Sequence, residues 1–371
     1  MVPSRFPAKI TLTRLLARWH RSLWSLLFLL VMALFGCATH SETQLPQKGA
    51  FEPPYFGVNL SGAEFNTQAL PGRYDFDYTY PDVQDVDYFM GKGMTIFRLP
   101  FRWERIQHET FDELNQQQLQ HIDRLVRHIT AKGALVILDP HNFARYYGNV
   151  IGEKDLPISA FADLWTKLAR HYKNNPNVLF GLMNEPSGMS SELWLEDANA
   201  AIAAIRATGA NNLILVPGNG FSGASSWFGS WYGTPNAEVL LSIEDPLDHY
   251  IIEVHQYLDA NSSGTSTTCV EAERLQRFTD WLKTHNKKAF LGEFGAADTP
   301  ECRQALAKML DHINANQAVW LGWTWWSAGP WWGSYPFSLQ PSNGKDRPQM
   351  RLLEHYMQQA KSPSSIQGDQ Q

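Results

Sequence analysis

The chain has 371 residues, a formal net charge of −6, 44% hydrophobic residues and 18% charged residues. This length suits one large α/β domain or two medium ones. Basic and acidic residues are interspersed, which argues against a nucleic-acid-binding surface. The 14 tryptophans are many for a chain of this size. Flat aromatic rings pack well against sugar rings, although we expect roughly half of these tryptophans to lie in the core.

The N-terminal segment predicts an export signal. Several basic residues precede an apolar run at residues 23–34, which is short for a membrane span. The run leads into Leu34-Phe35-Gly36-Cys37, which resembles a bacterial lipoprotein box. That resemblance implies that residues 1–36 are a signal peptide and that Cys37 becomes lipidated. A plain signal anchor with an incidental cysteine is the alternative.

Residues 37–53 are predicted to form a flexible tether behind the lipidated Cys37, because they are polar and contain proline and glycine. Ala38, the residue after the cysteine, is not an acidic retention signal. By resemblance to proteobacterial lipoproteins, we expect a protein anchored to the outer membrane or cell surface of a Gram-negative bacterium.

Residues 54–360 alternate short apolar runs with longer amphipathic stretches, which predicts strands followed by helices. The predicted strands are residues 55–60, 94–100, 135–140, 178–184, 213–217, 251–257, 289–294 and 319–326. The predicted helices are residues 82–92, 115–132, 159–174, 190–208, 271–286 and 300–316. Eight such units predict a single (β/α)8 TIM barrel, an α/β fold. We expect a weak helix or a loop at residues 219–248, and a polar tail at residues 361–371.

The predicted strands end in polar and aromatic residues, and in a TIM barrel those ends form the active-site face. The residues at or just after six strand ends are Arg98, Asp139, His141, Asn142, Asn184, Glu185, His255, Tyr257, Glu293, Trp325 and Trp326. Each could be structural by itself, as half of an ion pair or as part of the barrel wall. Their recurrence at strand after strand favours one shared site.

Glu185 and Glu293 are the predicted catalytic pair. Each ends an apolar run, one in Asn184-Glu185-Pro186 and the other in Gly292-Glu293. Two carboxyl groups that face each other are the groups that glycoside hydrolysis needs, because one protonates the leaving oxygen and the other attacks the sugar or activates water. The chain contains no serine-hydrolase elbow, zinc-protease motif, P-loop or dinucleotide-binding glycine motif.

These motifs resemble glycoside hydrolase family 5, over nearly the whole mature chain, and most closely its subfamily 5 of endo-β-1,4-glucanases. The matching pieces include Phe97-Arg98-Leu99-Pro100, Asp139-Pro140-His141-Asn142, Met183-Asn184-Glu185-Pro186, His255-Gln256-Tyr257-Leu258, Gly292-Glu293-Phe294-Gly295 and Trp323-Thr324-Trp325-Trp326. The Asn-Glu-Pro motif alone is shared by many barrel glycosidases. The ordered set is far more specific.

The resemblance implies a role for each matching residue. Glu185 would be the general acid/base and Glu293 the nucleophile of a retaining mechanism. Asn184 would bind the sugar 2-hydroxyl, while Arg98 and Tyr257 would hold Glu293. The other residues expected to line or support the site are His141, Asn142, His255, Trp326 and Trp227.

Trp326 is the expected platform beneath the sugar, because the family's tryptophan precedes a turn of two small residues and a glycine, here Ser327-Ala328-Gly329. Trp325 and the wall tryptophan Trp227 are the alternatives.

The implied activity is hydrolysis of internal β-1,4-glucosidic bonds in cellulose-like glucans by a monomer that needs no cofactor and no metal. Two alternatives stay open: the same chemistry on β-mannan, xyloglucan or mixed-linkage glucan, and a surface lipoprotein that binds glycan without cutting it. A metal held by His141, His255 and a carboxylate is also conceivable. The chain lacks the His-x-His strand pair of barrel metallohydrolases, so no metal site is predicted.

Cys269 and Cys302 remain after Cys37 and are predicted to form a disulfide. In an exported protein two cysteines most simply pair with each other. They lie at the starts of two consecutive predicted helices, and in a TIM barrel such helix starts are neighbours on the active-site face. Two unrelated thiols are the alternative.

Overall fold

The computed structural model describes residues 53–270 and 273–361. The predicted signal peptide, Cys37 and nearly all of the tether lie outside the described residues, as do residues 362–371. Within the described part, no helix is long and apolar enough to cross a membrane.

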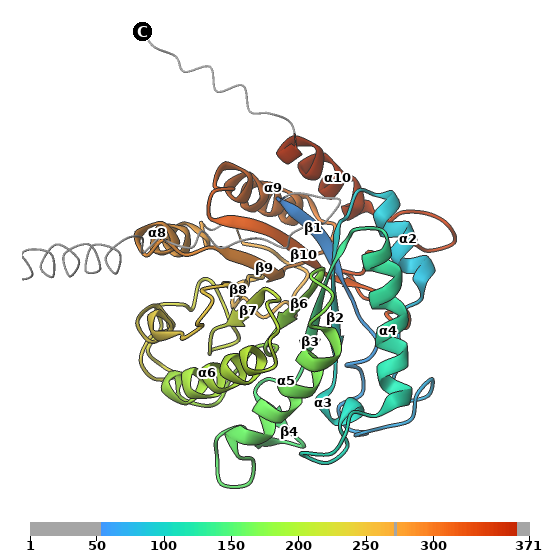
Figure 1. Cartoon of the computed structure of the whole chain (residues 1–371). Helices are drawn as coiled ribbons and strands as arrows, with labels where there is room; N and C mark the ends of the chain where they lie inside the picture. The colour runs from blue at the N-terminus through green and yellow to red at the C-terminus, as the bar shows by residue number, and fades with distance from the viewer. Residues whose placement is uncertain (1–52, 271–272, 362–371) are drawn as a thin grey trace, which may run out of the picture. The chain divides into compact units, whose positions relative to one another are not determined.

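Eight parallel strands in the described part of the chain close into a barrel, in the order β1-β10-β9-β8-β7-β6-β3-β2. The strands are β1 (Tyr55–Leu60), β2 (Ile96–Phe101), β3 (Leu135–Pro140), β6 (Val178–Gly181), β7 (Ile214–Pro217), β8 (Tyr250–His255), β9 (Ala289–Glu293) and β10 (Trp320–Ala328). Figure 1 shows the helices packed around this barrel. The predicted TIM barrel is therefore confirmed.

The helices that cover the barrel begin at capping residues that the sequence supplies. Asp82, Asn115, Ser190 and Thr299 each accept a hydrogen bond from a backbone N–H in the first turn of the helix that follows. The helices are α2 (Val83–Gly91), α3 (Trp103–Ile106), α4 (Gln116–Ala131), α5 (Ile158–Tyr172), α6 (Ser191–Ala207), α7 (Asn236–Val239), the 3-10 helix η1 (Leu240–Ser242), α8 (Gln276–Thr284), α9 (Pro300–Ala315) and α10 (Pro348–Lys361).

Two apolar layers hold the barrel together. The larger one joins the outward faces of the strands to the helices, and the smaller one lies inside the barrel. It consists of Tyr55, Ile96, Leu135, Ile137, Leu179, Leu213, Leu215, Ile251, Phe290 and Leu321, which come from all eight strand segments. Because side chains alternate along a strand, the residues two positions further along face the same side, toward the active-site end.

The connection between β7 and β8 contains only the short α7 and η1, as its weak helical pattern predicted. Other elements differ from the prediction. Helix α8 begins at Gln276, later than the predicted start at residue 271. Three elements were not predicted: the short α3, the terminal α10, and a small antiparallel sheet of β4 (Arg145–Tyr146) and β5 (Asn149–Val150).

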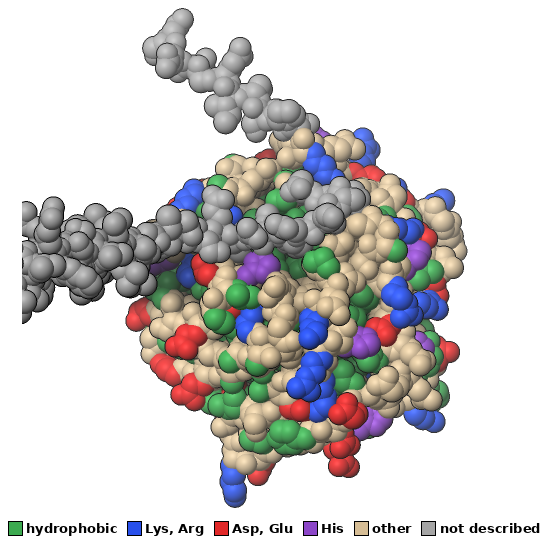
Figure 2. Space-filling model, in the orientation of Figure 1, with side chains coloured by type: hydrophobic (Ala, Val, Ile, Leu, Met, Phe, Trp, Pro, Cys, Tyr) green, Lys and Arg blue, Asp and Glu red, His purple; other side chains and the backbone are tan. Residues whose placement is uncertain are grey.

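Charged side chains are scattered over the face of the barrel domain in Figure 2, with both signs interspersed. No large basic area is visible on that face, which agrees with the even charge distribution along the sequence.

Candidate active site

Glu185 and Glu293 meet at the C-terminal end of the barrel. Glu293 is the last residue of β9, while Glu185 follows β6 after a short extended segment. One carboxylate oxygen of each and a ring nitrogen of His255 all lie within 4.8 Å of one another. Glu185 has a backbone φ of +46°, a conformation that a non-glycine residue adopts at a cost of about 1–3 kcal/mol. Backbone strain of this kind is typical of residues whose orientation serves a site.

Glu293 is almost completely buried, and donors occupy both of its oxygens. Nη1 of Arg98 donates to Oε1 at 2.8 Å, and the hydroxyl of Tyr257 donates to Oε2 at 2.9 Å. Burial raises the pKa of the Glu293 carboxyl, and the positive charges of His255 and Arg98 act in the opposite direction. Burial is the larger effect, so the pKa of Glu293 lies above its ordinary value, while the two neighbouring cations partly offset this and stabilise the ionised form that a nucleophile needs.

Glu185 keeps part of its side chain exposed and pairs with His255. Nδ1 of His255 lies 2.7 Å from Oε1 of Glu185 and 3.6 Å from Oε2 of Glu293. Burial alone would lower the pKa of this imidazole, but the surrounding carboxylates raise it to about 10. His255 is consequently a cation between the two glutamates at neutral pH.

Arg98 links several predicted site residues. Its Nη2 donates to Oδ1 of Asn184 at 2.8 Å, and its Nη1 also donates to Oδ1 of Asn59 at 2.9 Å. This leaves Nδ2 of Asn184, which is buried, without a hydrogen-bond partner among the described residues. A buried N–H without a partner is costly. A sugar hydroxyl would satisfy it, as the predicted role of Asn184 requires.

His141 and Asn142 follow β3, and their side chains have different roles. The ring of His141 stacks on Trp326, with centroids 5.2 Å apart and planes 16° apart, and its Nδ1 lies 2.9 Å from Oδ2 of Asp139. Burial lowers the pKa of His141 well below its ordinary value. Asn142 is buried, and it donates to Glu104 at 2.8 Å and accepts from the Trp103 N–H at 2.8 Å. Asn142 therefore supports the loop beneath the site.

The three candidate tryptophans are distinguished by burial. Trp326 is partly exposed beside His141, as a sugar platform must be. Trp325 is fully buried, with its Nε1 donating to the carbonyl of Phe337 at 2.7 Å. Trp227, predicted as a wall residue, is also fully buried and packs edge-to-face on Phe278. The prediction of a glycan contact for Trp227 is wrong, because its ring fills the layer between strands and helices.

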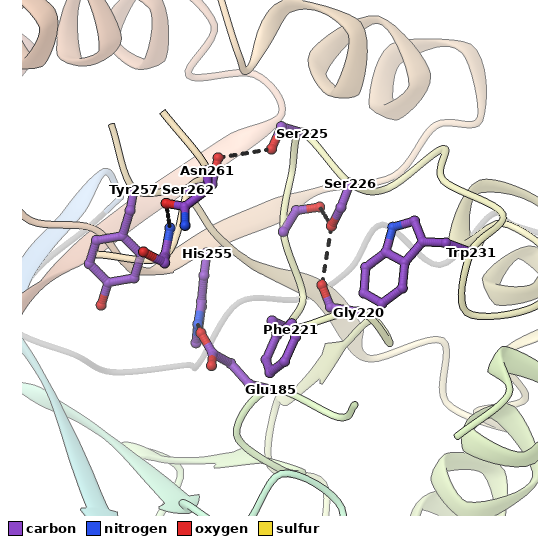
Figure 3. A pocket seen from close by; sticks show the side chains of 12 residues that line it. Glu185, Gly220, Phe221, Ser225, Ser226, Trp231, His255, Tyr257, Asn261 and Ser262 are labelled. Atoms are coloured by element: carbon purple, nitrogen blue, oxygen red, sulfur yellow. Dashed lines mark hydrogen bonds and ion pairs between the residues drawn. The ribbon is translucent and has the colours of Figure 1, made fainter. Parts of the chain in front are cut away.

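A cavity of about 350 Å³ extends from Glu185 and His255 (Figure 3). Two aromatic rings that were not among the predicted site residues line it: Phe221 is 49% exposed and Trp231 is 66% exposed. Both come from the connection between β7 and β8, where glycine and serine replace a helix. The only signal in the sequence was that unusual composition. The remaining lining residues are Gly220, Gly223, Ser225, Ser226, Tyr257, Asn261, Ser262 and Ser263.

Glu185, His255 and Glu293 are spaced as metal ligands can be. The metal arrangement considered from the sequence would need His141, which is not in this group. Both oxygens of Glu293 already receive hydrogen bonds from Arg98 and Tyr257, and a guanidinium beside the carboxylate disfavours a second cation. The donor set suits an ionised carboxylate better than a metal ion.

Comparison with known proteins agrees with this site. Residues 58–329 match the family model "Cellulase (glycosyl hydrolase family 5)". The chain is 39% identical over 304 residues to endo-beta-1,4-glucanase A of Emericella nidulans, covering 81% of this chain and 90% of that protein.

Solved structures show the same similarity. The endo-beta-1,4-glucanase Xac0029 of Xanthomonas axonopodis pv. citri is 48% identical, with a TM-score of 0.81 over 83% of this chain and 99% of that one. XacCel5A, solved in complex with cellopentaose, is 49% identical with a TM-score of 0.80, over 82% of this chain and 99% of that one. Endoglucanase Cel5A of Pseudomonas stutzeri, solved with cellobiose, is 36% identical with a TM-score of 0.77, over 84% of this chain and 95% of that one. The chain belongs to the cellulases of glycosyl hydrolase family 5.

Proposed function

We propose that this protein is a retaining endo-β-1,4-glucanase of subfamily 5, with Glu293 as nucleophile and Glu185 as acid/base. The observation that carries the proposal is the short separation of the two carboxylates, whose oxygens approach within 4.8 Å. Retaining glycosidases hold their carboxyl groups about 5–5.5 Å apart, whereas inverting ones need about 6.5–9.5 Å to admit a water molecule.

In the first step an oxygen of Glu293 attacks the anomeric carbon as the bond to the leaving glucose oxygen breaks. Glu185 gives its proton to that oxygen, and the glycan on the far side departs as an alcohol. The hydrogen bonds from Arg98 and Tyr257 orient Glu293 for attack. Nδ2 of Asn184 is available to bind the 2-hydroxyl of the reacting sugar.

In the second step water attacks the anomeric carbon of the glycosyl ester. Glu185, now ionised, takes a proton from the water, and the ester bond to Glu293 breaks to restore its carboxylate. The ester oxygen carries no full negative charge, so Glu185 no longer faces a neighbouring anion during this step.

Aromatic rings lie on both sides of the glutamate pair, which supports cleavage within a chain. Trp326 with His141 forms a platform on one side, while Phe221 and Trp231 line the cavity on the other. We assign the leaving part of the glycan to the cavity, because Glu185, the proton donor, is among its lining residues. The similarity to XacCel5A, solved in complex with cellopentaose, supports a β-1,4-glucan as substrate.

The deciding experiment measures reducing-end release from carboxymethylcellulose, glucomannan, xyloglucan and mixed-linkage glucan in parallel, with Glu293→Gln as the inactive control. We expect the highest rate on carboxymethylcellulose, a rapid fall in viscosity and a β-configured first product by NMR. Preference for another glycan would revise the substrate. Net inversion would refute the mechanism, and binding without release of reducing ends would indicate a glycan-binding lipoprotein.

We further propose that the mature protein is a monomer tethered by a lipid on Cys37 to the outer membrane or cell surface. The support is the apolar run 23–34, the Gly36-Cys37 junction and the polar tether that follows. Cys37→Ser should abolish labelling by a radioactive or clickable fatty acid and release the enzyme from the membrane fraction. Wild-type protein recovered only as a soluble, unacylated species would contradict this anchor.

A further inference from the structure

Glu253 is a buried carboxylate directly behind the site. It lies on β8 between Ile251, which belongs to the apolar layer inside the barrel, and His255 at the mouth. Because side chains two apart on a strand share a face, all three point into the barrel. The side chain of Glu253 is only 1% exposed. A charge in this position costs several kcal/mol unless other charges compensate it.

Two positive groups compensate Glu253, and each of them contacts a catalytic glutamate. Oε1 of Glu253 lies 3.0 Å from Nε of Arg98 and 3.6 Å from Nε2 of His255. The other nitrogens of these two residues face the catalytic groups, Nη1 of Arg98 toward Glu293 and Nδ1 of His255 toward Glu185. Glu253 is thus connected to Glu293 through Arg98 and to Glu185 through His255.

The neighbouring strand leaves room for this carboxylate. A Cβ on Gly292 of β9 would lie 2.1 Å from Oε1 of Glu253, so no larger residue fits there without moving it. Gly292 directly precedes the nucleophile Glu293. The absence of a side chain at Gly292 therefore leaves space for the carboxylate of Glu253 beside the strand that carries Glu293.

We propose that Glu253 is a positioning residue whose negative charge holds Arg98 beneath Glu293 and keeps His255 as the cationic partner of Glu185. The inference rests on the proposed function. The titratable and charged groups that face it from the surrounding strands are Arg98, Asp139, His141 and His255. Glu185, Tyr257 and Glu293 lie one contact further away, against His255, Arg98 and one another.

The charge balance predicts the sign of the effect. Arg98 and His255 are surrounded by the carboxyl groups of Asp139, Glu185, Glu253 and Glu293, so removal of the charge of Glu253 makes the electrostatic potential at both catalytic carboxyls more positive. A more positive potential favours ionised carboxylates, which then lose their protons at lower pH. It also disfavours the imidazolium form of His255, whose pKa the neighbouring carboxylates now hold at about 10.

The test compares Glu253→Gln, which is nearly isosteric and removes the charge, with Glu253→Asp, which keeps it. In Glu253→Gln both limbs of the pH profile of kcat/KM for an aryl cellobioside should move to lower pH by about one unit, a tenfold loss on the alkaline limb. The decrease should lie in kcat, because Glu253 is behind the substrate. Glu253→Asp should restore the limbs, even if its rate is lower.

Asp197→Asn is the matched control, because Asp197 is also a fully buried carboxylate but lies on α6 away from the site. Its pH limbs should match those of the wild type. Unchanged limbs in folded Glu253→Gln would overturn the proposal, since a purely structural role would lower the rate at every pH alike.

Nitrogen-15 NMR of the histidine rings provides a measurement that needs neither activity nor a stable Glu253 variant. In the wild type His255, assigned from its missing signal in His255→Asn, should remain doubly protonated at pH 8. A neutral ring at that pH would refute the inference even if the enzyme cleaves cellulose. A charged ring in a protein that cleaves no glycan would instead refute the proposed function alone.

Discussion

His141 and Trp326 lie nearly parallel at the barrel mouth, with ring centroids 5.2 Å apart and planes 16° apart. His141 is held in turn by Asp139, so the histidine supports one face of a tryptophan that is still partly exposed. A platform that is held from behind loses little side-chain entropy when a sugar stacks on it.

Trp326→Ala should therefore weaken glycan binding more than it disturbs the fold. Loss of a stacking platform should cost about 1–3 kcal/mol, by analogy with the stacking of flat rings on aromatics. Calorimetric titration of cello-oligosaccharide into an inactive Glu293→Gln background measures it. Trp325→Phe is the control: its ring is buried, so it should lower stability and leave the affinity of the folded protein unchanged. The reverse outcome would move the platform to Trp325.

The two glutamates should differ under chemical rescue. Glu185→Ala and Glu293→Ala should each lose nearly all activity on polysaccharide. With an activated substrate, azide should yield a β-glycosyl azide from Glu185→Ala, because Glu293 still forms the covalent intermediate. From Glu293→Gly it should yield an α-linked product, because azide replaces the nucleophile directly. NMR of the products decides the matter, and the same anomer from both variants would invalidate the role assignment.

The predicted disulfide between Cys269 and Cys302 is confirmed, with Cα atoms 5.0 Å apart and a separation of 33 residues in sequence. Cys302 is in the first turn of α9, so the bond ties the connection after β8 to that helix. Cys269→Ser/Cys302→Ser should lower the free energy of unfolding by about 3–4 kcal/mol, according to the chain-entropy model. Urea denaturation measures this. Thiol titration of the unfolded wild type should find neither of these two cysteines free, and two free thiols would contradict the pairing.

Asp197 should make stability depend on pH. Both of its oxygens lack a hydrogen-bond partner among the described residues, and burial raises its pKa to about 8. The folded state keeps this proton while the unfolded state loses it above its ordinary value of 3.8, so the free energy of unfolding falls as pH rises from about 4 to about 8. Asp197→Asn removes this slope and should stabilise the protein at pH 8 by about 1–3 kcal/mol.

Urea denaturation of Asp197→Asn at pH 5 and pH 8 checks the sign. The gain over the wild type should be small at the lower pH and larger at the higher one. Asp155→Asn, which alters an exposed aspartate, is the control and should change stability little at either pH. An equal gain at both pH values would show that the carboxyl is not protonated in the folded protein.

Trp231→Ala should impair cleavage of long cello-oligosaccharides more than cleavage of an aryl cellobioside. Only the longer substrate places glucose units on the leaving side, where Trp231 lines the cavity. Loss of the ring should remove about 1–3 kcal/mol of binding free energy for cellopentaose and lower its kcat/KM accordingly. Leu247→Ala is the control, because Leu247 is 42% exposed in the same connection but precedes β8 at the opposite end of the barrel. Equal losses on both substrates would contradict the assignment.

The sequence by itself determined the barrel and the identity of its catalytic candidates. Strands β1 and β3 begin and end where the apolar runs predicted, and the other barrel strands were placed within a few residues. Parallel strands buried on both faces leave this strong local signal. Because every strand of such a barrel ends on one face, Glu185, His255 and Glu293 could be expected to meet there from the sequence alone. Arg98 was predicted near the end of its strand, whereas it lies in the middle of β2 and reaches Glu293 from inside the barrel.

Only the tertiary structure decided which residues act through others and which rings face the glycan. Glu253 lies inside the apolar run of β8, and its contact with Arg98 exists only once β2 and β8 close the same barrel. Trp227 and Trp231 lie in one loop without periodicity, yet one is buried and the other exposed. Local periodicity predicts strands and helices, whereas the burial of a loop side chain depends on packing between segments distant in sequence.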